Sequence, residues 1–340
     1  MTIIELNNLT KYFKVLKRRE GLIGTIKDLF KPKHEVVKAV DNISMKIDQG
    51  EIVGFVGPNG AGKSTTIKML IGVLKPTSGD LAIYNYLPYK QRKDYVKNIG
   101  VVIGNRTMLW WDLAVIESFK LLKEIYQISD KDYEQNLEIY NQFFNLSALY
   151  STPVRKLSLG QKMLCEIAAA FLHNPKLIFL DEPTIGLDVA VKEKVRKLII
   201  DLNKIKKTTI LLTTHDIGDI EELCKRIILI DNGKLIYDGD IKKFNLIFGA
   251  YRTLTLELGE IDDIPIESIN EEISDTFKPI EPIILKKKEE IWLTLTINQD
   301  DTKLIDILNF LMKKFSVKDI KIEEVELERV IKEVYAGGLK

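Results

Sequence analysis

Residues 51–64 read EIVGFVGPNGAGKS, and this stretch decides the fold. The apolar run 51–56 is typical of a strand covered on both faces. It leads into a glycine-rich turn that fits the pattern G-x-x-x-x-G-K-[ST] and opens a helix at 65–71. Glycines let such a turn approach phosphate closely, so that its N–H groups bind the oxygens, and the helix N-terminus adds partial positive charge. The stretch therefore predicts a phosphate-binding loop; the flanking strand and helix disfavour the alternative, a plain glycine-rich turn.

The residues of this loop have separate predicted roles. Lys63 neutralises the β- and γ-phosphates, and the hydroxyl of Ser64 is a ligand for Mg²⁺. The ligands implied are therefore ATP and Mg²⁺. The predicted contacts of the loop with the nucleotide are Gly57, Pro58, Asn59, Gly60, Ala61, Gly62, Lys63, Ser64 and Thr65.

Two adjacent carboxylates, Asp181 and Glu182, follow the apolar run 177–180 (LIFL). The C-terminal edge of a doubly wound sheet is where such folds bind ligands. We expect Asp181 to reach the Mg²⁺ shell and Glu182 to orient and deprotonate the attacking water. An acidic pair alone is usually a solvated strand end. A phosphate loop in the same chain favours the catalytic interpretation.

Residues 157–161 (LSLGQ) open a helix at 162–172, upstream of the acidic strand. A serine-capped helix would explain the local sequence, but it would not explain this position in the chain. The stretch resembles the signature loop of the ABC ATPases, usually LSGGQ. That resemblance implies that Ser158, Gly160 and Gln161 complete the nucleotide site of an opposite subunit.

Other stretches resemble elements of the same family in the expected order. Residues 186–188 (GLD) resemble the D-loop and implicate Asp188, and His215 resembles the switch histidine that contacts the γ-phosphate. Phe13 resembles the aromatic residue on which adenine stacks. The likeness covers about residues 1–240 and is closest to single-cassette bacterial ATPases of the drug and viologen exporter type. It departs where Asn105 replaces the expected Q-loop glutamine, a residue that would reach the metal, and where Leu159 replaces a signature glycine.

Length and periodicity predict two domains in the 340 residues. The resemblance and the short apolar runs at 51–56, 177–180, 209–213 and 227–230 imply an α/β P-loop NTPase of ABC type with a mixed or parallel core sheet. We expect this cassette at 1–245, with an inserted helical subdomain at about 89–175. A small α+β accessory domain is expected at 252–340. Its predicted elements are strands at 253–258, 283–297 (or a hairpin) and 320–325, a helix at 302–315 and a short helix through Val330 and Val334.

Composition limits the partners and the compartment. The chain has 50 Lys and Arg against 49 Asp and Glu, a net charge of +1, which gives no general attraction to nucleic acid or anionic membrane. Its two cysteines lack a CxxC arrangement and suit a reducing cytosol. No apolar stretch reaches the ~18 residues of a membrane-spanning helix, and the N-terminus lacks the layout of a signal peptide. We therefore expect a cytoplasmic protein without a nucleic-acid partner.

Two segments suggest a membrane partner. Residues 14–38 are basic around apolar positions at helical spacing, which favours a helix packed on its own domain over a contact with a permease or headgroups. Residues 109–113 (LWWDL) follow the Q-loop position, where the family receives the permease's coupling helix. Core packing explains one of two adjacent tryptophans more readily than both, because strand neighbours face opposite ways.

These observations predict an ATP-hydrolysing cassette, present as a homodimer or cassette pair, that powers a separate multi-span permease from the inner face of the membrane. The resemblance implies that the direction of transport is export. A soluble ABC ATPase of ribosome regulation, cluster assembly or DNA repair is the alternative. A ribosomal factor would normally carry two tandem cassettes and a repair ATPase a long coiled coil, and the chain has neither. A GTPase is disfavoured because 203–206 (NKIK) lacks the guanine-reading aspartate.

Overall fold

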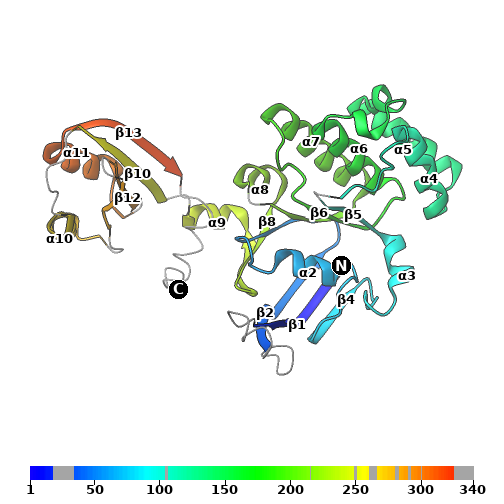
Figure 1. The fold of residues 1–340 in the computed structure, drawn as a ribbon, viewed down its shortest axis with the longest axis horizontal. Coiled ribbons are helices and arrows are strands. Elements are labelled where there is room, and N and C mark those ends of the chain that lie inside the picture. The colour runs from blue at the N-terminus through cyan, green and yellow to red at the C-terminus, as the bar shows by residue number, and fades with distance from the viewer. Residues whose placement is uncertain are drawn as a thin grey trace, which may run out of the picture. The chain divides into compact units, whose positions relative to one another are not determined.

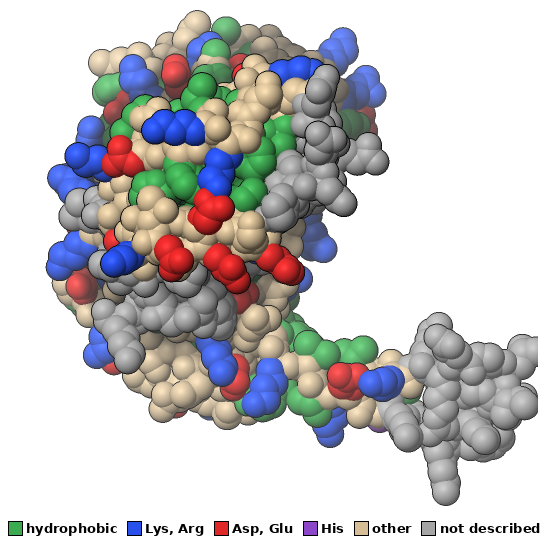
Figure 2. Space-filling view, turned by 90° about the vertical axis from the view of Figure 1, so that its left-hand side faces the viewer, with side chains coloured by type: hydrophobic (Ala, Val, Ile, Leu, Met, Phe, Trp, Pro, Cys, Tyr) green, Lys and Arg blue, Asp and Glu red, His purple; other side chains and the backbone are tan. Residues whose placement is uncertain are grey.

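The computed structural model describes residues 1–17, 34–103, 106–214, 216–248, 251–259, 266–279, 283–289, 292–299 and 301–324. The chain divides into two units, Met1–Ile241 and Lys242–Lys340 (Figure 1). Each unit has its own hydrophobic core. On the face that Figure 2 presents, acidic and basic side chains both occur among apolar ones, in keeping with the net charge of +1.

The main sheet of the N-terminal unit has six strands in the order β5-β6-β7-β3-β8-β9. Its strands are parallel except β9, which runs antiparallel to β8. The inner strands are short apolar runs with buried side chains, as expected where helices cover both faces. The strands are β3 (Ile52–Val56), β5 (Ile99–Ile103), β6 (Leu177–Asp181), β7 (Thr209–Thr213), β8 (Arg226–Asp231) and β9 (Lys234–Asp240).

A second, antiparallel sheet of order β2-β1-β4 packs beside it. Its strands are β1 (Thr2–Leu16), β2 (His34–Asp48) and β4 (Ser78–Ile83). Helix α2 (Lys63–Leu70) lies between the two sheets (Figure 1). One hydrophobic cluster joins side chains from both sheets and from this helix, including Ile4, Phe55 and Met69. The helix that follows the glycine-rich turn is therefore fixed on both sides.

The range expected to hold an inserted helical subdomain, about 89–175, contains helices and also the strand β5. That strand, IGVVI, pairs in parallel with β6 and extends the main sheet. A short apolar run cannot be assigned to helix or strand by periodicity alone. The helices of this unit are α3 (Arg92–Tyr95), α4 (Val115–Tyr126), α5 (Asp130–Phe144), α6 (Leu159–Phe171), α7 (Val189–Lys206) and α8 (Ile217–Leu223).

The C-terminal unit is a four-stranded antiparallel sheet with two helices that supply its core. Element order β-α-β-β-α-β and strand order β11-β12-β10-β13 give it the ferredoxin-like arrangement. The predicted short helix through Val330 and Val334 lies outside the described residues. Its elements, after α9 (Ile241–Phe248), are β10 (Tyr251–Leu258), α10 (Ile266–Phe277), β11 (Lys286–Glu289), β12 (Trp292–Asn298), α11 (Leu304–Lys314) and β13 (Val317–Glu324).

Among the described parts of both units, no helix has the length and apolar character needed to span a bilayer.

Candidate functional site

The glycine-rich turn joins the end of β3 to the start of α2, and sterics require glycine at two of its positions. A Cβ on Gly57 would lie 2.2 Å from the carbonyl oxygen of Ile230. Gly62 has φ 107°, and a Cβ there would lie 2.4 Å from the carbonyl oxygen of Ala39. Both contacts are to backbone, which cannot move aside cheaply. The turn is therefore built against its neighbours in a shape that only glycine allows.

Lys63, the first residue of α2, folds back over this turn. Its Nζ donates to the carbonyl oxygens of Gly57 at 2.5 Å and Pro58 at 3.0 Å. Burial lowers the pKa of Lys63, while the nearby charges of Glu182 and Asp181 oppose that shift. The cation of the turn and the two predicted acids thus lie within electrostatic reach of one another. Ser64 and Thr65 follow in the first turn of the helix.

Strand register explains why these groups meet. Asp181 pairs with Thr213 across β6 and β7, and Thr213 pairs with Phe55 across β7 and β3. Because all three strands are parallel, their carboxyl ends share one edge of the sheet, the edge where such sheets bind ligands. The turn that begins at Gly57 therefore starts beside the acidic pair.

Thr213 fixes both acids, and sequence reasoning missed it. Its hydroxyl donates to Oδ1 of Asp181 at 2.5 Å. The N–H of Glu182 donates to the Thr213 carbonyl at 3.0 Å and to its hydroxyl at 3.2 Å. Glu182 has φ 55°, in the left-handed region. A hydroxyl residue at the carboxyl end of an otherwise apolar strand, TILLT, was the available signal.

The LSLGQ stretch forms the start of α6. Ser158 is the N-cap: its Oγ accepts from the N–H of Gln161 at 3.2 Å, and Gln161 Oε1 accepts from the N–H of Ser158 at 2.9 Å. A Cβ on Gly160 would lie 2.3 Å from Cγ1 of Val191 on α7. Leu159 is instead 51% exposed. The packing thus explains why the motif keeps glycine at 160 and accepts leucine at 159.

The remaining predicted residues are spread over several elements. Phe13 lies in β1, partly buried, with Nζ of Lys11 5.3 Å from its ring centroid. Asp188 is the N-cap of α7 and accepts from the N–H of Val191 at 3.0 Å. Asn105 and His215 both lie outside the described residues. The predicted contacts of those two side chains therefore stay predictions.

The LWWDL stretch contacts α6, and both of its tryptophans are exposed to solvent. Trp110 is 39% exposed and Trp111 is 54% exposed, with Nζ of Lys162 5.5 Å from the Trp111 ring. Thr107 and Met108, just before this stretch, both bind the buried carboxylate of Glu166 on α6. The Thr107 hydroxyl donates to it, and the N–H of Met108 donates to it at 3.1 Å. Burial raises the pKa of Glu166, and these hydrogen bonds oppose the rise. Two adjacent core rings, the alternative that the sequence disfavoured, are therefore not observed.

Comparisons with known proteins agree with this geometry. The family described as ABC transporter matches residues 40–185. The ABC transporter ATP-binding protein NatA of Bacillus subtilis (strain 168) is 32% identical over 213 residues, which are 63% of this chain and 86% of that protein. The bacitracin transport ATP-binding protein BcrA of Bacillus licheniformis is 38% identical over 200 residues, 58% of this chain and 64% of that protein.

Solved structures give the same match. The structure of an ATP-binding subunit of an ABC transporter has a TM-score of 0.59 and 26% identity, and covers 73% of this chain and 93% of that one. A dimeric ATP-binding cassette in a post-hydrolysis state, bound to ADP and Pi, has a TM-score of 0.56 and 27% identity, and covers 70% of this chain and 99% of that one.

Proposed function

Because this chain belongs to the ATP-binding proteins of ABC transporters and hydrolyses ATP, we propose that it drives a separate multi-span permease that exports its cargo. One observation supports the catalytic part most directly: the strand register that places Asp181, Thr213 and the Gly57 turn side by side at one edge of the sheet. Phosphate binding and water activation need those groups together.

Within that site, we assign the nucleotide contacts as follows. Backbone N–H groups of residues 57–65 and the N-terminus of α2 bind the phosphates, Lys63 neutralises them, and Phe13 stacks on adenine. Mg²⁺ prefers oxygen ligands, and the Ser64 hydroxyl and the Asp181 carboxylate, oriented by Thr213, supply that chemistry. Asn105 is the third proposed ligand. Bound Mg²⁺ would neutralise charge that develops on the transferred phosphoryl group.

Glu182 is the proposed general base, and His215 the proposed contact to the γ-phosphate. The two hydrogen bonds from the Glu182 N–H to Thr213 hold the backbone of the base beside Asp181. A carboxylate held there can orient a water and take its proton.

A second copy of the chain would complete the site through Ser158, Gly160, Gln161 and Asp188. The surface around these motifs supports a docking role, because the large apolar side chains Leu159, Ile185 and Val189 are exposed there, Val189 at 75%. The two motifs also adjoin: a Cβ on Gly186 would lie 3.4 Å from Leu159 Cδ2. Burial of this apolar surface would favour the dimer.

Mixed dimers test the shared site. Ser158→Arg should leave ATP binding by the monomer intact but prevent ATP-dependent dimerisation and hydrolysis, because the new cation blocks the partner's nucleotide. Lys63→Ala should lose ATP binding. In a mixture of the two variants, one site of each mixed dimer carries both defects and the other carries neither, so hydrolysis should return in part. Absence of rescue at every mixing ratio would contradict the shared site.

Export and attachment to the inner face of the membrane rest on the resemblance to drug-exporter ATPases and on a relative named for bacitracin transport. The exposed Trp110 and Trp111 supply a surface for the permease. Purification of the tagged chain from detergent-extracted membranes should recover a multi-span protein in a fixed ratio to the chain. Recovery of the chain from the soluble fraction with ribosomal or DNA-repair components would instead favour the soluble alternative.

A further inference from the structure

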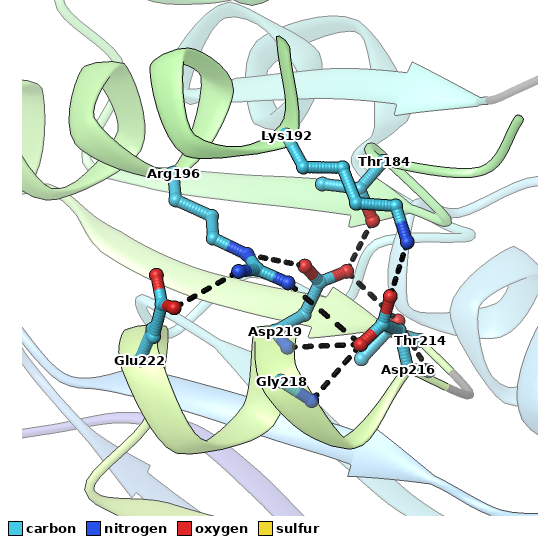
Figure 3. A network of polar contacts seen from close by, with 8 residues as sticks. All are labelled: Thr184, Lys192, Arg196, Thr214, Asp216, Gly218, Asp219 and Glu222. Atoms are coloured by element: carbon cyan, nitrogen blue, oxygen red, sulfur yellow. Dashed lines mark hydrogen bonds and ion pairs between the residues drawn. The ribbon is translucent and has the colours of Figure 1, made fainter. Parts of the chain in front are cut away.

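A buried polar network joins α7 and α8 to the loops that follow β6 and β7 (Figure 3). Its centre is Asp219, whose side chain is fully buried. Oδ1 of Asp219 accepts from Nε of Arg196 on α7 at 2.6 Å. Oδ2 accepts from two hydroxyls, those of Thr184 and, at 3.1 Å, Thr214. One carboxylate thus holds three segments that are far apart in sequence.

Asp216 forms a second node of the same network. Its Oδ1 accepts from the N–H of Gly218 at 2.9 Å and caps α8, and its Oδ2 accepts from Lys192 on α7. Its own N–H donates to the Thr214 hydroxyl at 3.0 Å. Burial would raise the pKa of Asp216, but the hydrogen bond and charge of Lys192 outweigh it and lower the pKa. The node is therefore an ion pair at neutral pH.

The attachment points of this network lie close in sequence to three of the proposed site residues: Glu182, His215 and Asp188. Thr184 lies two residues after Glu182, and Thr214 and Asp216 flank position 215. Lys192 lies four residues after Asp188, in the first part of α7. Because Thr184 and Thr214 donate to the same oxygen, a shift of one loop relative to the other breaks a hydrogen bond in a buried place.

We propose that Asp219 and Arg196 are positioning residues for ATP hydrolysis. They hold the loop of Glu182 and the loop of His215 in one fixed relation to α7, and this inference rests on the roles proposed for those two residues. Through α7, the network also connects both loops to the exposed Ile185 and Val189. Docking of a second subunit on that surface would then fix the positions of the two catalytic loops through this network.

The informative variants remove one hydroxyl each and leave the Arg196–Asp219 ion pair intact. Breaking a buried ion pair can unfold a protein, so Asp219 and Arg196 themselves are poor first targets. Thr184→Val and Thr214→Val are close to isosteric and keep the ion pair. We expect Thr184→Val to lower kcat for ATP about tenfold, the effect of about one hydrogen bond on the barrier, with KM for ATP near the wild-type value. Thr214→Val also loses the hydrogen bond from the Asp216 N–H, so its kcat should fall at least as far.

The serine variants separate positioning from packing. Thr184→Ser and Thr214→Ser keep the hydroxyl but lose a buried methyl group, so they destabilise the fold without removing the hydrogen bond to Asp219. Positioning predicts that serine restores kcat and valine does not. A merely structural network predicts that kcat follows the melting temperature across all four variants, whichever residue is introduced, and that result would overturn the proposal. Wild-type kcat in both valine variants would overturn it as well.

Glu222→Gln is the matched control within the same network. Glu222 pairs with Nη1 of Arg196 at 3.0 Å, but its carboxylate is 54% exposed and contacts neither catalytic loop. Its kcat should stay at the wild-type value, because the Arg196–Asp219 pair and both hydroxyl hydrogen bonds to Asp219 remain; a tenfold loss there would show that hydrolysis does not depend specifically on the two hydroxyls and would overturn the proposal. Glu182→Gln tests the proposed base independently: full turnover in that variant would refute the base, whereas an inactive Glu182→Gln beside fully active valine variants would refute only the network.

Discussion

At the scale of single residues, Glu182 is one of several non-glycine residues with a positive φ, and it is the one that follows the metal ligand proposed on β6. A glutamate at φ 55° occupies a region that non-glycine residues rarely adopt, and such a conformation costs of order 1–3 kcal/mol. The hydrogen bonds to Thr213 compensate for part of that cost. Strain retained in this way is typical of a residue whose position serves chemistry.

Replacement of Glu182 by glutamine tests that role. The amide keeps the size of the side chain but cannot accept the proton of the attacking water. We expect ATP binding to be retained and hydrolysis to fall by ~10²- to 10⁴-fold, the range for loss of a general base. Equilibrium binding of a fluorescent ATP analogue and single-turnover phosphate release measure the two properties separately. Turnover close to that of the wild type would assign the base elsewhere.

Residues of this site differed in how far sequence could identify them. The positions of Lys63 and Ser64 at the start of α2 were predictable because the glycine-rich turn and the helix after it form one continuous stretch of sequence. Thr213 and Asp219 were not, because their partners lie far along the chain: Thr184 and Asp219 are 35 residues apart. Only the folded sheet brings such hydroxyls and carboxylates together. The local sequence pattern alone therefore does not predict such contacts.

At the scale of elements, α6 and α7 pack at Gly160 without room for a side chain. A methyl group at this position would meet Cγ1 of Val191 at 2.3 Å, and the other valine carbons at 3.3 Å limit escape by rotation. Gly160→Ala should therefore destabilise the N-terminal unit by about 1–3 kcal/mol, as overpacked cores do. The midpoint of urea unfolding gives the value.

Leu159→Ala is the control for that experiment, since Leu159 is exposed and its truncation should change the midpoint little. Equal midpoints for Gly160→Ala and the wild type would mean that the helices separate freely, and the steric account of the signature glycine would be wrong.

The LWWDL stretch is a second element with a testable role. If its exposed rings anchor the permease, Trp110→Ala or Trp111→Ala should weaken permease binding by ~2 kcal/mol or more, about thirtyfold in Kd. Basal ATP hydrolysis and the melting temperature of the isolated chain should change little. The measurement is co-purification with the permease, with basal ATP hydrolysis and melting temperature of the isolated chain as the two controls. A lower melting temperature with normal permease recovery would show that the rings serve packing instead.

Elements were partly predictable as well. The long helices α4 and α5 were expected because their apolar residues recur at helical spacing over many residues. β5 was missed inside the expected helical range, and α10 was missed in the C-terminal unit, where only Ile269 and Ile273 mark its buried face. β5 has only five residues, too few for a period to be distinguished.

At the scale of the whole molecule, acid should destabilise the N-terminal unit through His173. Its ring stacks on Tyr126 at a centroid distance of 3.9 Å, and Nε2 donates to the carbonyl oxygen of Ile99 at 2.9 Å. Among the described residues, no hydrogen-bond partner meets its Nδ1. Burial lowers the pKa of His173 to about 4, against the opposing effect of the Ile99 hydrogen bond. The folded state therefore holds this imidazole neutral.

The sign of the pH dependence follows. An unfolded histidine takes up a proton near pH 6.5, well above the folded pKa, so the unfolded state binds more protons in the window between about 6.5 and 4. Stability should fall as pH drops through that window, by up to about 2 kcal/mol between pH 7.5 and 5. His173→Phe keeps the stack and should reduce this loss, measured by urea unfolding. His34→Gln, at an exposed histidine, is the control. Parallel losses in all three proteins would exclude His173 as the source.

The position of β3 in the main sheet also sets the order in which a ribosome can complete the molecule. Both neighbours of this strand, β7 and β8, are made late: from Val56 to Asp231 the chain grows by 231 − 56 = 175 residues. At about 5–20 residues per second, translation takes roughly 9 to 35 s to cover that interval. Until Asp231 has been made, the glycine-rich turn lacks at least one of the two strands that flank β3. We therefore expect the growing chain to bind ATP only after β8 has left the ribosome.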